Sequence, residues 1–489
     1  NNTAIGTSAL TANTTGTRNV AVGANTLDAN TTANDNTAIG YIALSANTTG
    51  SSNTAIGSFC LDVNTTGNNN TGVGVGTLGA NTEGLTNTAV GSQALTANTT
   101  GNNNVALGGF SLDVNTTGSS NTAVGVGSLG NSTTASNNTA VGLDALNSNT
   151  TGNSNNAFGK DAGKSITTGS NNNFFGSLAG ENTSTSDFNC AFGQEALEAN
   201  STGASNVAMG FRALEANTTA NNNTALGSQA LKANTTGFNN VAVGTESFQN
   251  NTTAGNNTGL GRRAGKANTT GTLLVAIGQG ALESNTTANS NTAVGCNALN
   301  LNTTGANNTA VGDAALTANT TGTQNTAVGV NALSHETTAQ NNTAVGHDCM
   351  QETTTGENNT AVGSFAFYFN TTGSNNTSMG KDALLVNTTG TDNTAVGFNS
   401  LDANTTGTLN TAVGRFSLSA NTTGGKNVAI GGNSLFSNTE GEFNTAVGYN
   451  CLDANTTADN NTAVGYHALI LNTTGTSNLA VGSLALDAA

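Results

Sequence analysis

Two histidine–carboxylate pairs carry most of the acid–base chemistry that this sequence offers. His335 is followed by Glu336, and His347 is followed by Asp348. A histidine beside a carboxylate can serve as a general base or contribute to a metal site. The two histidines, however, fall at different phases of the repeat that organises the chain. We therefore expect solvated surface histidines, no metal site, no cofactor and no catalytic residue, and we predict that the protein is not an enzyme.

The cysteines offer thiol chemistry, but they follow no spacing that is typical of a metal site or a disulfide framework. They are Cys60, Cys190, Cys296, Cys349 and Cys451. Three of them, Cys60, Cys349 and Cys451, occupy a repeat position that is normally held by Ala or Ser. We expect these three to be small buried thiols that replace small apolar groups.

Charge and apolar run length disfavour two classes of partner. The formal net charge is −16, with only 11 Lys and Arg residues. Because neutralising phosphates takes clustered cations, we expect no nucleic-acid partner. The one tight basic group, Arg262, Arg263 and Lys266, is interpreted as a solvated turn. No run of apolar residues is long enough to cross a bilayer, so we expect no membrane span.

All of these residues lie within a strict sequence repeat. The phrase NTAIG begins at Asn2, returns as NVAVG at Asn19 and as NTAIG at Asn36, and continues at a constant interval of 17 residues through 29 copies, the last of which is cut short. Numbered from that Asn, the consensus is N-T-A-V-G-x-x-A-L-x-A-N-T-T-G-x-x. A fixed period of this kind indicates a solenoid. We predict one continuous parallel β-solenoid (β-roll) over 1–489, with 29 coils.

Four positions of the repeat form the expected ladders of stacked, equivalent residues. They are Asn at position 1 (Asn2, Asn19), an apolar residue at position 4 (Ile5, Val22), Gly at position 5 (Gly6, Gly23) and Leu at position 9 (Leu10, Leu27). Frequent Gly and β-branched residues disfavour a helix. We predict two strands per coil, residues 2–5 and 9–12 in the first one, with turns of left-handed geometry at Gly of position 5 and at the N-T-T-G stretch.

The charged residues indicate which positions face inward. They are absent from positions 1 to 5, 8, 9, 13 and 15. We expect positions 2, 4 and 9 to point into the coil and positions 1 and 3 to point away. The small residue at position 3, nearly always Ala, then indicates that a second chain packs there. Near residues 155–193 the aromatic residues are expected inside, facing Gly at position 9. They are Phe158, Phe174, Phe175 and Phe192, opposite Gly163 and Gly180.

The repeat also resembles known fibrous proteins. N-T-A-V-G-x-x-A-L resembles the N-S-V-A-I-G-x-x-A repeats of trimeric autotransporter adhesin heads, and NTAVGSQALTANTTGNNN at Asn87–Asn104 resembles the repeat shafts of phage tail-fibre-like proteins. The resemblance covers the whole chain and implies parallel β-rolls interlocked as a homotrimeric fibre. It also implies a location outside the cell, on a cell surface or on a virion. The adhesin-head period is shorter than the period found in this chain.

These observations predict a structural or adhesive fibre shaft that self-associates as a homotrimer. The first alternative is a subunit of an end-to-end extracellular filament, and the second is an ice-binding solenoid. Aromatic side chains at turns are the candidate contacts for cell-surface carbohydrate or for another chain. They are Phe365, Phe367, Tyr368, Phe369, Phe398, Phe416, Tyr449 and Tyr466.

Overall fold

The computed structural model describes residues 1–487 and confirms an all-β solenoid with a 17-residue period. Each coil contributes one strand of three residues, at positions 2 to 4, and this gives 29 strands in the described part of the chain. Turns and extended segments make up the rest of each coil, and no helix occurs in residues 1–487. The period read from the sequence is therefore the period of the backbone.

The chain divides into two compact units, which are described separately. The first, Asn1–Ala242, contains β1 to β14, the second begins at Val243 and contains β16 to β29, and β15 (Val241–Val243) lies at the division. In the first unit the strands are β1 (Thr3–Ile5), β2 (Val20–Val22), β3 (Thr37–Ile39), β4 (Thr54–Ile56), β5 (Thr71–Val73), β6 (Thr88–Val90), β7 (Val105–Leu107), β8 (Thr122–Val124), β9 (Thr139–Val141), β10 (Asn156–Phe158), β11 (Asn173–Phe175), β12 (Cys190–Phe192), β13 (Val207–Met209) and β14 (Thr224–Leu226). In the second unit they are β16 (Thr258–Leu260), β17 (Val275–Ile277), β18 (Thr292–Val294), β19 (Thr309–Val311), β20 (Thr326–Val328), β21 (Thr343–Val345), β22 (Thr360–Val362), β23 (Thr377–Met379), β24 (Thr394–Val396), β25 (Thr411–Val413), β26 (Val428–Ile430), β27 (Thr445–Val447), β28 (Thr462–Val464) and β29 (Leu479–Val481).

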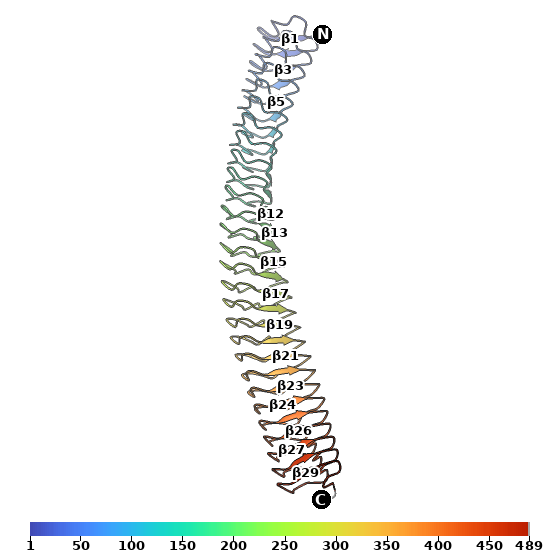
Figure 1. Cartoon of the computed structure of the whole chain (residues 1–489). Coiled ribbons are helices and arrows are strands. Elements are labelled where there is room, and N and C mark those ends of the chain that lie inside the picture. Colours follow the sequence, from blue (N-terminus) through green and yellow to red (C-terminus); the bar gives the residue numbers. More distant parts are fainter. Residues whose placement is uncertain (488–489) are drawn as a thin grey trace. The chain divides into compact units, whose positions relative to one another are not determined.

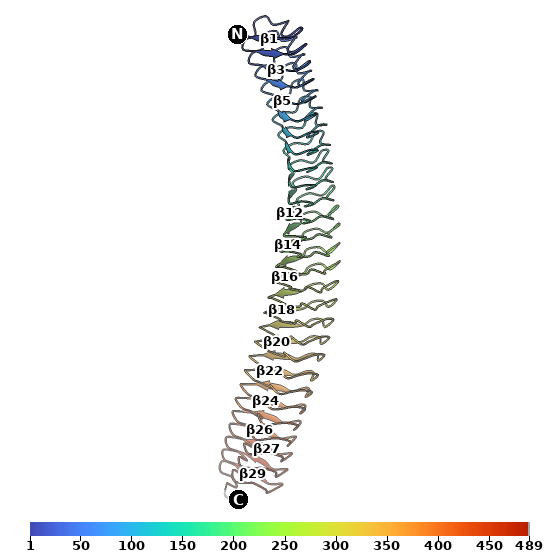
Figure 2. The same ribbon diagram turned by 180° about the vertical axis from the view of Figure 1, so that it is seen from behind.

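Successive coils stack in register within each unit. Strand β6 pairs in parallel with β7, with Thr88 opposite Val105 and Val90 opposite Leu107. Within each unit, the strand arrows in Figures 1 and 2 lie one above another along one side of the coils. Hydrogen bonds between coils continue beyond the strands, for example from Leu95 N to Ser111 O (2.9 Å). Equivalent residues therefore form ladders all around the coil, as the period predicts.

The prediction of a second strand at positions 8 to 11 is wrong. Positions 7 and 9 have left-handed backbones, with φ of 57° at Gln93 and 55° at Leu95. Strands need negative φ throughout, so the chain turns here twice instead of extending. Tight turns make the corner, although its backbone still bonds to the next coil, as Ala97 N does to Asp113 O (2.9 Å).

The inward and outward faces of the strand are the reverse of the prediction. In every strand after β1 the middle residue, at position 3, is buried, whereas positions 2 and 4 are half-exposed or exposed. Asn19 is buried at position 1, while Ile5 and Val22 at position 4 point outward. Leu27 is buried as predicted. Position 3 is small because it faces Leu across a thin interior, so its size gives no indication of a second chain.

Two ladders of asparagine side chains occupy the interior, and hydrogen bonds between successive coils stabilise these buried amides. Asn98, at position 12, donates from Nδ2 to Asn81 Oδ1 (2.8 Å) in the preceding coil and to Gly101 O (3.1 Å). Asn87, at position 1, donates to the same carbonyl (2.8 Å), and its own N–H is bonded to Asn70 Oδ1 (3.0 Å). Buried amides are tolerated when their hydrogen bonds are made, and here each coil supplies the partner for the next.

Glycine is needed at positions 5 and 15 of the coil for two different physical reasons. Position 5 takes a positive φ, 129° at Gly6 and 139° at Gly23, as predicted. Position 15 does not supply the left-handed turn expected in N-T-T-G; besides positions 5, 7 and 9, positive φ occurs at position 17, as at Asn103 (56°). Glycine at position 15 instead permits a close approach, because a Cβ on Gly101 would lie 2.3 Å from the carbonyl oxygen of Gly118.

The compensation between phenylalanine and glycine is confirmed for one ring only. Phe174 sits at position 3 and is fully buried, and a Cβ on Gly180 would lie 2.5 Å from its ring. The other three phenylalanines, Phe158, Phe175 and Phe192, occupy position 4 and lie on the outer face, contrary to the prediction. A second core of this kind, in which buried Phe248 fills the space left by Gly259 and Gly265, was not anticipated.

Candidate functional site

The most continuous surface feature is the outer side of the strands, which we call the strand face. It consists of the side chains at positions 2 and 4 of each coil. Position 4 is apolar in all 29 coils and is never buried: Leu226 is 44% exposed and Leu260 is 49% exposed. Position 2 is mostly Thr or Val. Each unit therefore presents a charge-free stripe of β-branched and apolar side chains.

Three aromatic rings raise the apolar character of the strand face in the first unit. Phe158 stacks on Phe175 with ring centroids 4.8 Å apart, and Phe175 stacks on Phe192 at 5.6 Å. Phe192 is still 55% exposed. Stacked rings that retain this exposure are typical of the central part of a protein contact surface.

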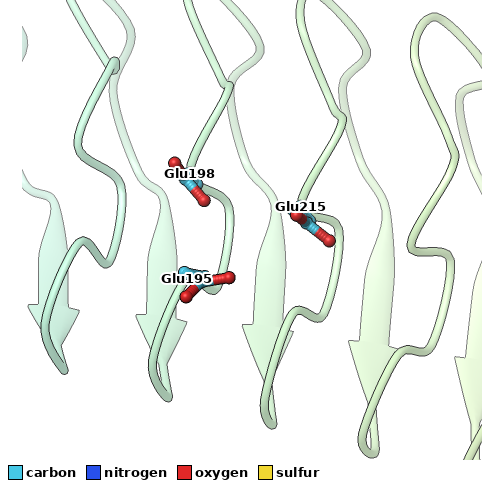
Figure 3. A group of neighbouring side chains, drawn as sticks. All are labelled: Glu195, Glu198 and Glu215. Atoms are coloured by element: carbon cyan, nitrogen blue, oxygen red, sulfur yellow. The ribbon is translucent and has the colours of Figure 1, made fainter.

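Acidic side chains gather at positions 7 and 10, on the loop that follows each strand. Glu195 and Glu198 project from one coil and Glu215 from the next (Figure 3). Arg212 bonds to Glu195, and Lys232 lies 3.5 Å from Glu215. The Arg212 guanidinium lowers the pKa of Glu195, whereas desolvation and the neighbouring carboxylates raise the pKa of Glu198. We interpret the cluster as an ion-pair ladder, since cations of the chain already face two of its three carboxylates.

The histidines lie on the surface, as predicted. Their side chains are 52% exposed for His335 and 55% for His347. His335 Nδ1 lies 3.0 Å from Glu352 in the next coil, and His347 Nδ1 lies 2.9 Å from Asp348. Each histidine thus has its own carboxylate, and these contacts do not bring the two pairs into one site.

The cysteine prediction is confirmed at the three equivalent positions. Cys60, Cys349 and Cys451 are fully buried. Desolvation raises the pKa of the Cys60 and Cys349 thiols to about 12 and that of Cys451 to about 11. Because the thiolate is the reactive form, these residues are inert spacers in the core.

The predicted aromatic group near residue 365 is divided between core and surface. Phe367 occupies position 9, where most coils have Leu, and it is fully buried, so it is not available for binding. Phe369 is 46% exposed, and its ring centroid lies 4.6 Å from that of Tyr368, which is 5.7 Å from Phe365. Three of the four rings therefore remain as a surface cluster.

The other predicted aromatics lie along turns of the second unit. Phe398 and Phe416 meet edge to face at 5.5 Å, and Tyr449 stacks on Tyr466 at 6.1 Å. Between these pairs Gly432 replaces the side chain of position 6, which opens a groove of about 490 Å³. The groove is lined by Arg415, Phe416, Ser419, Gly432, Asn433, Phe436 and Tyr449.

One buried carboxyl was not anticipated from the sequence. Glu336 takes position 12, in the interior asparagine ladder, and it is fully buried. Its oxygens accept hydrogen bonds from Asn325 Nδ2 (2.5 Å) and Asn342 Nδ2 (3.1 Å). Desolvation raises the pKa of Glu336 to about 8. The signal was available in its repeat position, because position 12 otherwise holds side chains that suit the interior.

Comparison with known proteins assigns no function to this chain. No protein-family model matches the sequence, and no curated protein matches it significantly. In the part of the chain that the structure describes, no helix has the length and apolar character needed to cross a bilayer.

Proposed function

We propose that this chain is the repetitive shaft of a fibre outside the cell, on a cell surface or on a virion, with a structural or adhesive role. The observation that carries the proposal is the uniformity of the coil. Within residues 1–487 a strand recurs at the same three positions in every coil, with no inserted loop. Such a chain can act as a spacer of fixed length and presents the same surface in every coil. Binding and catalytic sites, in contrast, commonly sit on loops that depart from a regular scaffold.

Self-association as a homotrimer is part of this proposal. Light scattering after size exclusion is expected to give a native mass near three times 48.1 kDa. A monomer would contradict the homotrimer. A broad distribution of much larger species would instead support an end-to-end filament, and electron micrographs would then show variable lengths.

The groove at Gly432 supports a contact with carbohydrate. Its walls combine aromatic faces with hydrogen-bonding groups: Arg415 lies over the Phe416 ring at 4.6 Å, and Asn433 Nδ2 donates to Asn450 at 3.1 Å. Sugar rings present apolar C–H faces and hydroxyl groups, so they match a surface of this kind.

Phe416→Ala is expected to weaken binding to immobilised glycans about tenfold, the loss that corresponds to one buried aromatic contact. Phe110→Ala is the matched control, because Phe110 occupies the same repeat position and is 50% exposed, and it does not line this groove. Equal binding by both variants, or no glycan bound by the wild type, would exclude the groove as a carbohydrate site.

A further inference from the structure

We propose that copies of this chain associate through the strand face. Side chains at positions 2 and 4 of one copy pack against those of the next, around an axis that follows the stack of coils. This inference rests on the proposed function, because it names the surface by which the homotrimer assembles. It moves the contact from position 3, where the sequence pattern placed it, because position 3 is buried inside the coil.

The hydrogen bonding of the strands decides the kind of contact. The main-chain groups of a strand such as β6 are used by the coils before and after it, through the pairings β5–β6 and β6–β7. A partner therefore finds no free strand edge along the side of a unit. It can only pack face to face, through side chains, as stacked sheets do at about 10 Å.

The charge distribution favours the strand face over the other sides of the coil. No Asp, Glu, Lys or Arg occurs at positions 2 to 4 in any coil. Charged residues gather at other positions, including 7 and 10, where Glu195, Arg212 and Glu215 form their ladder. Since each chain carries a net charge of −16, repulsion between copies is smallest when they meet at a face that carries no charged side chains.

The spacing of the stripe identifies the occupant as a second copy. One apolar residue emerges per coil, at the spacing of hydrogen-bonded strands, which is about 4.8 Å. A partner that covers the stripe of one unit must present side chains at the same spacing and over the same number of coils. Another copy of this chain meets both conditions, and cyclic symmetry then holds equivalent coils at the same level.

The area of the stripe is sufficient for stable association. An aliphatic side chain has on the order of 100 Å² of apolar surface to bury, and Leu107, Leu226 and Phe192 are 37%, 44% and 55% exposed. At roughly 50 Å² per coil, the fourteen strands of the first unit offer roughly 700 Å² before the position 2 side chains are added. Standard interfaces bury about 800 Å² per partner. The stacked rings that end at Phe192 would lie within this contact.

A crystalline lattice such as ice is the competing occupant, because a Thr ladder lies beside the apolar one. Ice requires a flat and regular array. The strand face instead varies in height, from Val141 through the Phe158 ring to Met209 at position 4, and it carries Asn156 and Cys190 at position 2. Variation of this kind suits side-chain packing between protein copies.

The test compares two triple variants of the full chain. The strand-face variant carries Ile56→Asp, Leu107→Asp and Phe192→Asp, at side chains that are 38%, 37% and 55% exposed. The control variant carries Tyr41→Asp, Phe110→Asp and Phe188→Asp, at side chains that are 49%, 50% and 62% exposed but lie at positions 6, 7 and 17. Light scattering gives the mass, and circular dichroism shows that each variant is folded.

The strand-face variant is expected to fall from about three times 48.1 kDa to that single mass, while the control keeps the mass of the wild type. A third variant with Thr at the three strand-face positions retains strand propensity and should dissociate at higher protein concentration than the wild type. If the wild type is oligomeric and both strand-face variants keep its mass, the strand face is not the contact surface, although the homotrimer itself is not contradicted. A monomeric wild type would refute both, and thermal hysteresis lost in the strand-face variant would assign the face to ice.

Discussion

Replacing Glu336 by Asn is expected to stabilise the second unit at pH 8 and above, and to remove a fall in stability that the wild type shows between about pH 4.5 and pH 8. Glu336 is buried in the asparagine ladder, and its pKa is raised from 4.5 to about 8. A raised carboxyl pKa means that folding favours the protonated form. Its contribution to the free energy of unfolding is complete below about pH 4.5 and decreases by about 1.4 kcal/mol per pH unit until about pH 8.

The asparagine ladder explains why the protonated acid suits this position. In the regular ladder each Oδ1 accepts a hydrogen from the next amide, but the Oδ1 of Asn319 is buried without a partner among the described residues. Glu336 follows it and brings a hydrogen only when it is protonated. Asn at position 336 restores a permanent donor, and Glu336→Gln keeps an uncharged group of the original size.

Thermal unfolding followed between pH 4 and pH 9 tests this prediction. Both variants are expected to show a flatter pH profile than the wild type. Glu440→Gln is the control, because it removes an exposed carboxylate from a turn and should leave the profile unchanged. A wild type whose stability does not fall across this range would show that Glu336 is ionised without cost. Glu357, which also raises the pKa of Glu336, must be left intact in all variants.

Gly180→Leu is expected to destabilise the first unit strongly, although Leu is the consensus residue at position 9. The backbone tolerates Leu there, since φ is 60° at Gly180 and 55° at Leu95. The obstacle is Phe174, whose ring occupies the volume that Leu would need, because a Cβ added at Gly180 would lie only 2.5 Å from that ring. Overpacking of this kind costs about 1–3 kcal/mol or more.

The double variant Phe174→Ala with Gly180→Leu is expected to recover part of the loss, because it recreates the Ala and Leu pairing within that coil, while the space beside Gly163, where an added Cβ would lie 2.8 Å from the Phe174 ring, stays unfilled. Phe174→Ala alone leaves a cavity and should cost about 3–5 kcal/mol. Thermal unfolding of the four proteins gives the coupling energy. Gly109→Leu, on an open turn, is the control and should change stability little. Additive effects of the two core substitutions would contradict direct packing between them.

The period, the parallel stacking and the buried Leu of position 9 could be predicted from the sequence because each depends on a regular pattern alone. Hydrophobicity alone could not predict which positions of the strand point into the interior. Thr and Val look more suited to a core than Asn and Ala, but the interior is too thin for both Leu and Val. The asparagines remain inside because each coil satisfies the amides of the next, as Asn81 does for Asn98.

Pairs of residues that depart from the consensus indicate correctly that position 3 points inward. Gly72 stands at position 3 where Cys60, at position 8 of the preceding coil, takes the space of its Cβ. Gly259 makes the same allowance for Phe248. Such pairs place position 3 beside positions 8 and 9, which is inside. Among the candidate binding residues, Phe367 could have been assigned to the core by its position, whereas the groove at Gly432 depends on side-chain orientations that no repeat pattern contains.

The in-register pairing of each coil with its immediate neighbours has a consequence for how such a gene can change. A coil that bonds only to the coils before and after it presents the same hydrogen-bonding groups above and below as other coils, except where two neighbouring coils share a matched core pair such as Phe248 and Gly259. Removing or duplicating one whole repeat therefore rejoins two compatible surfaces, whereas gaining or losing a single residue displaces every ladder beyond it. The length of this protein is thus a quantity that recombination between repeats can adjust in steps of one coil, while selection against partial repeats keeps the period constant.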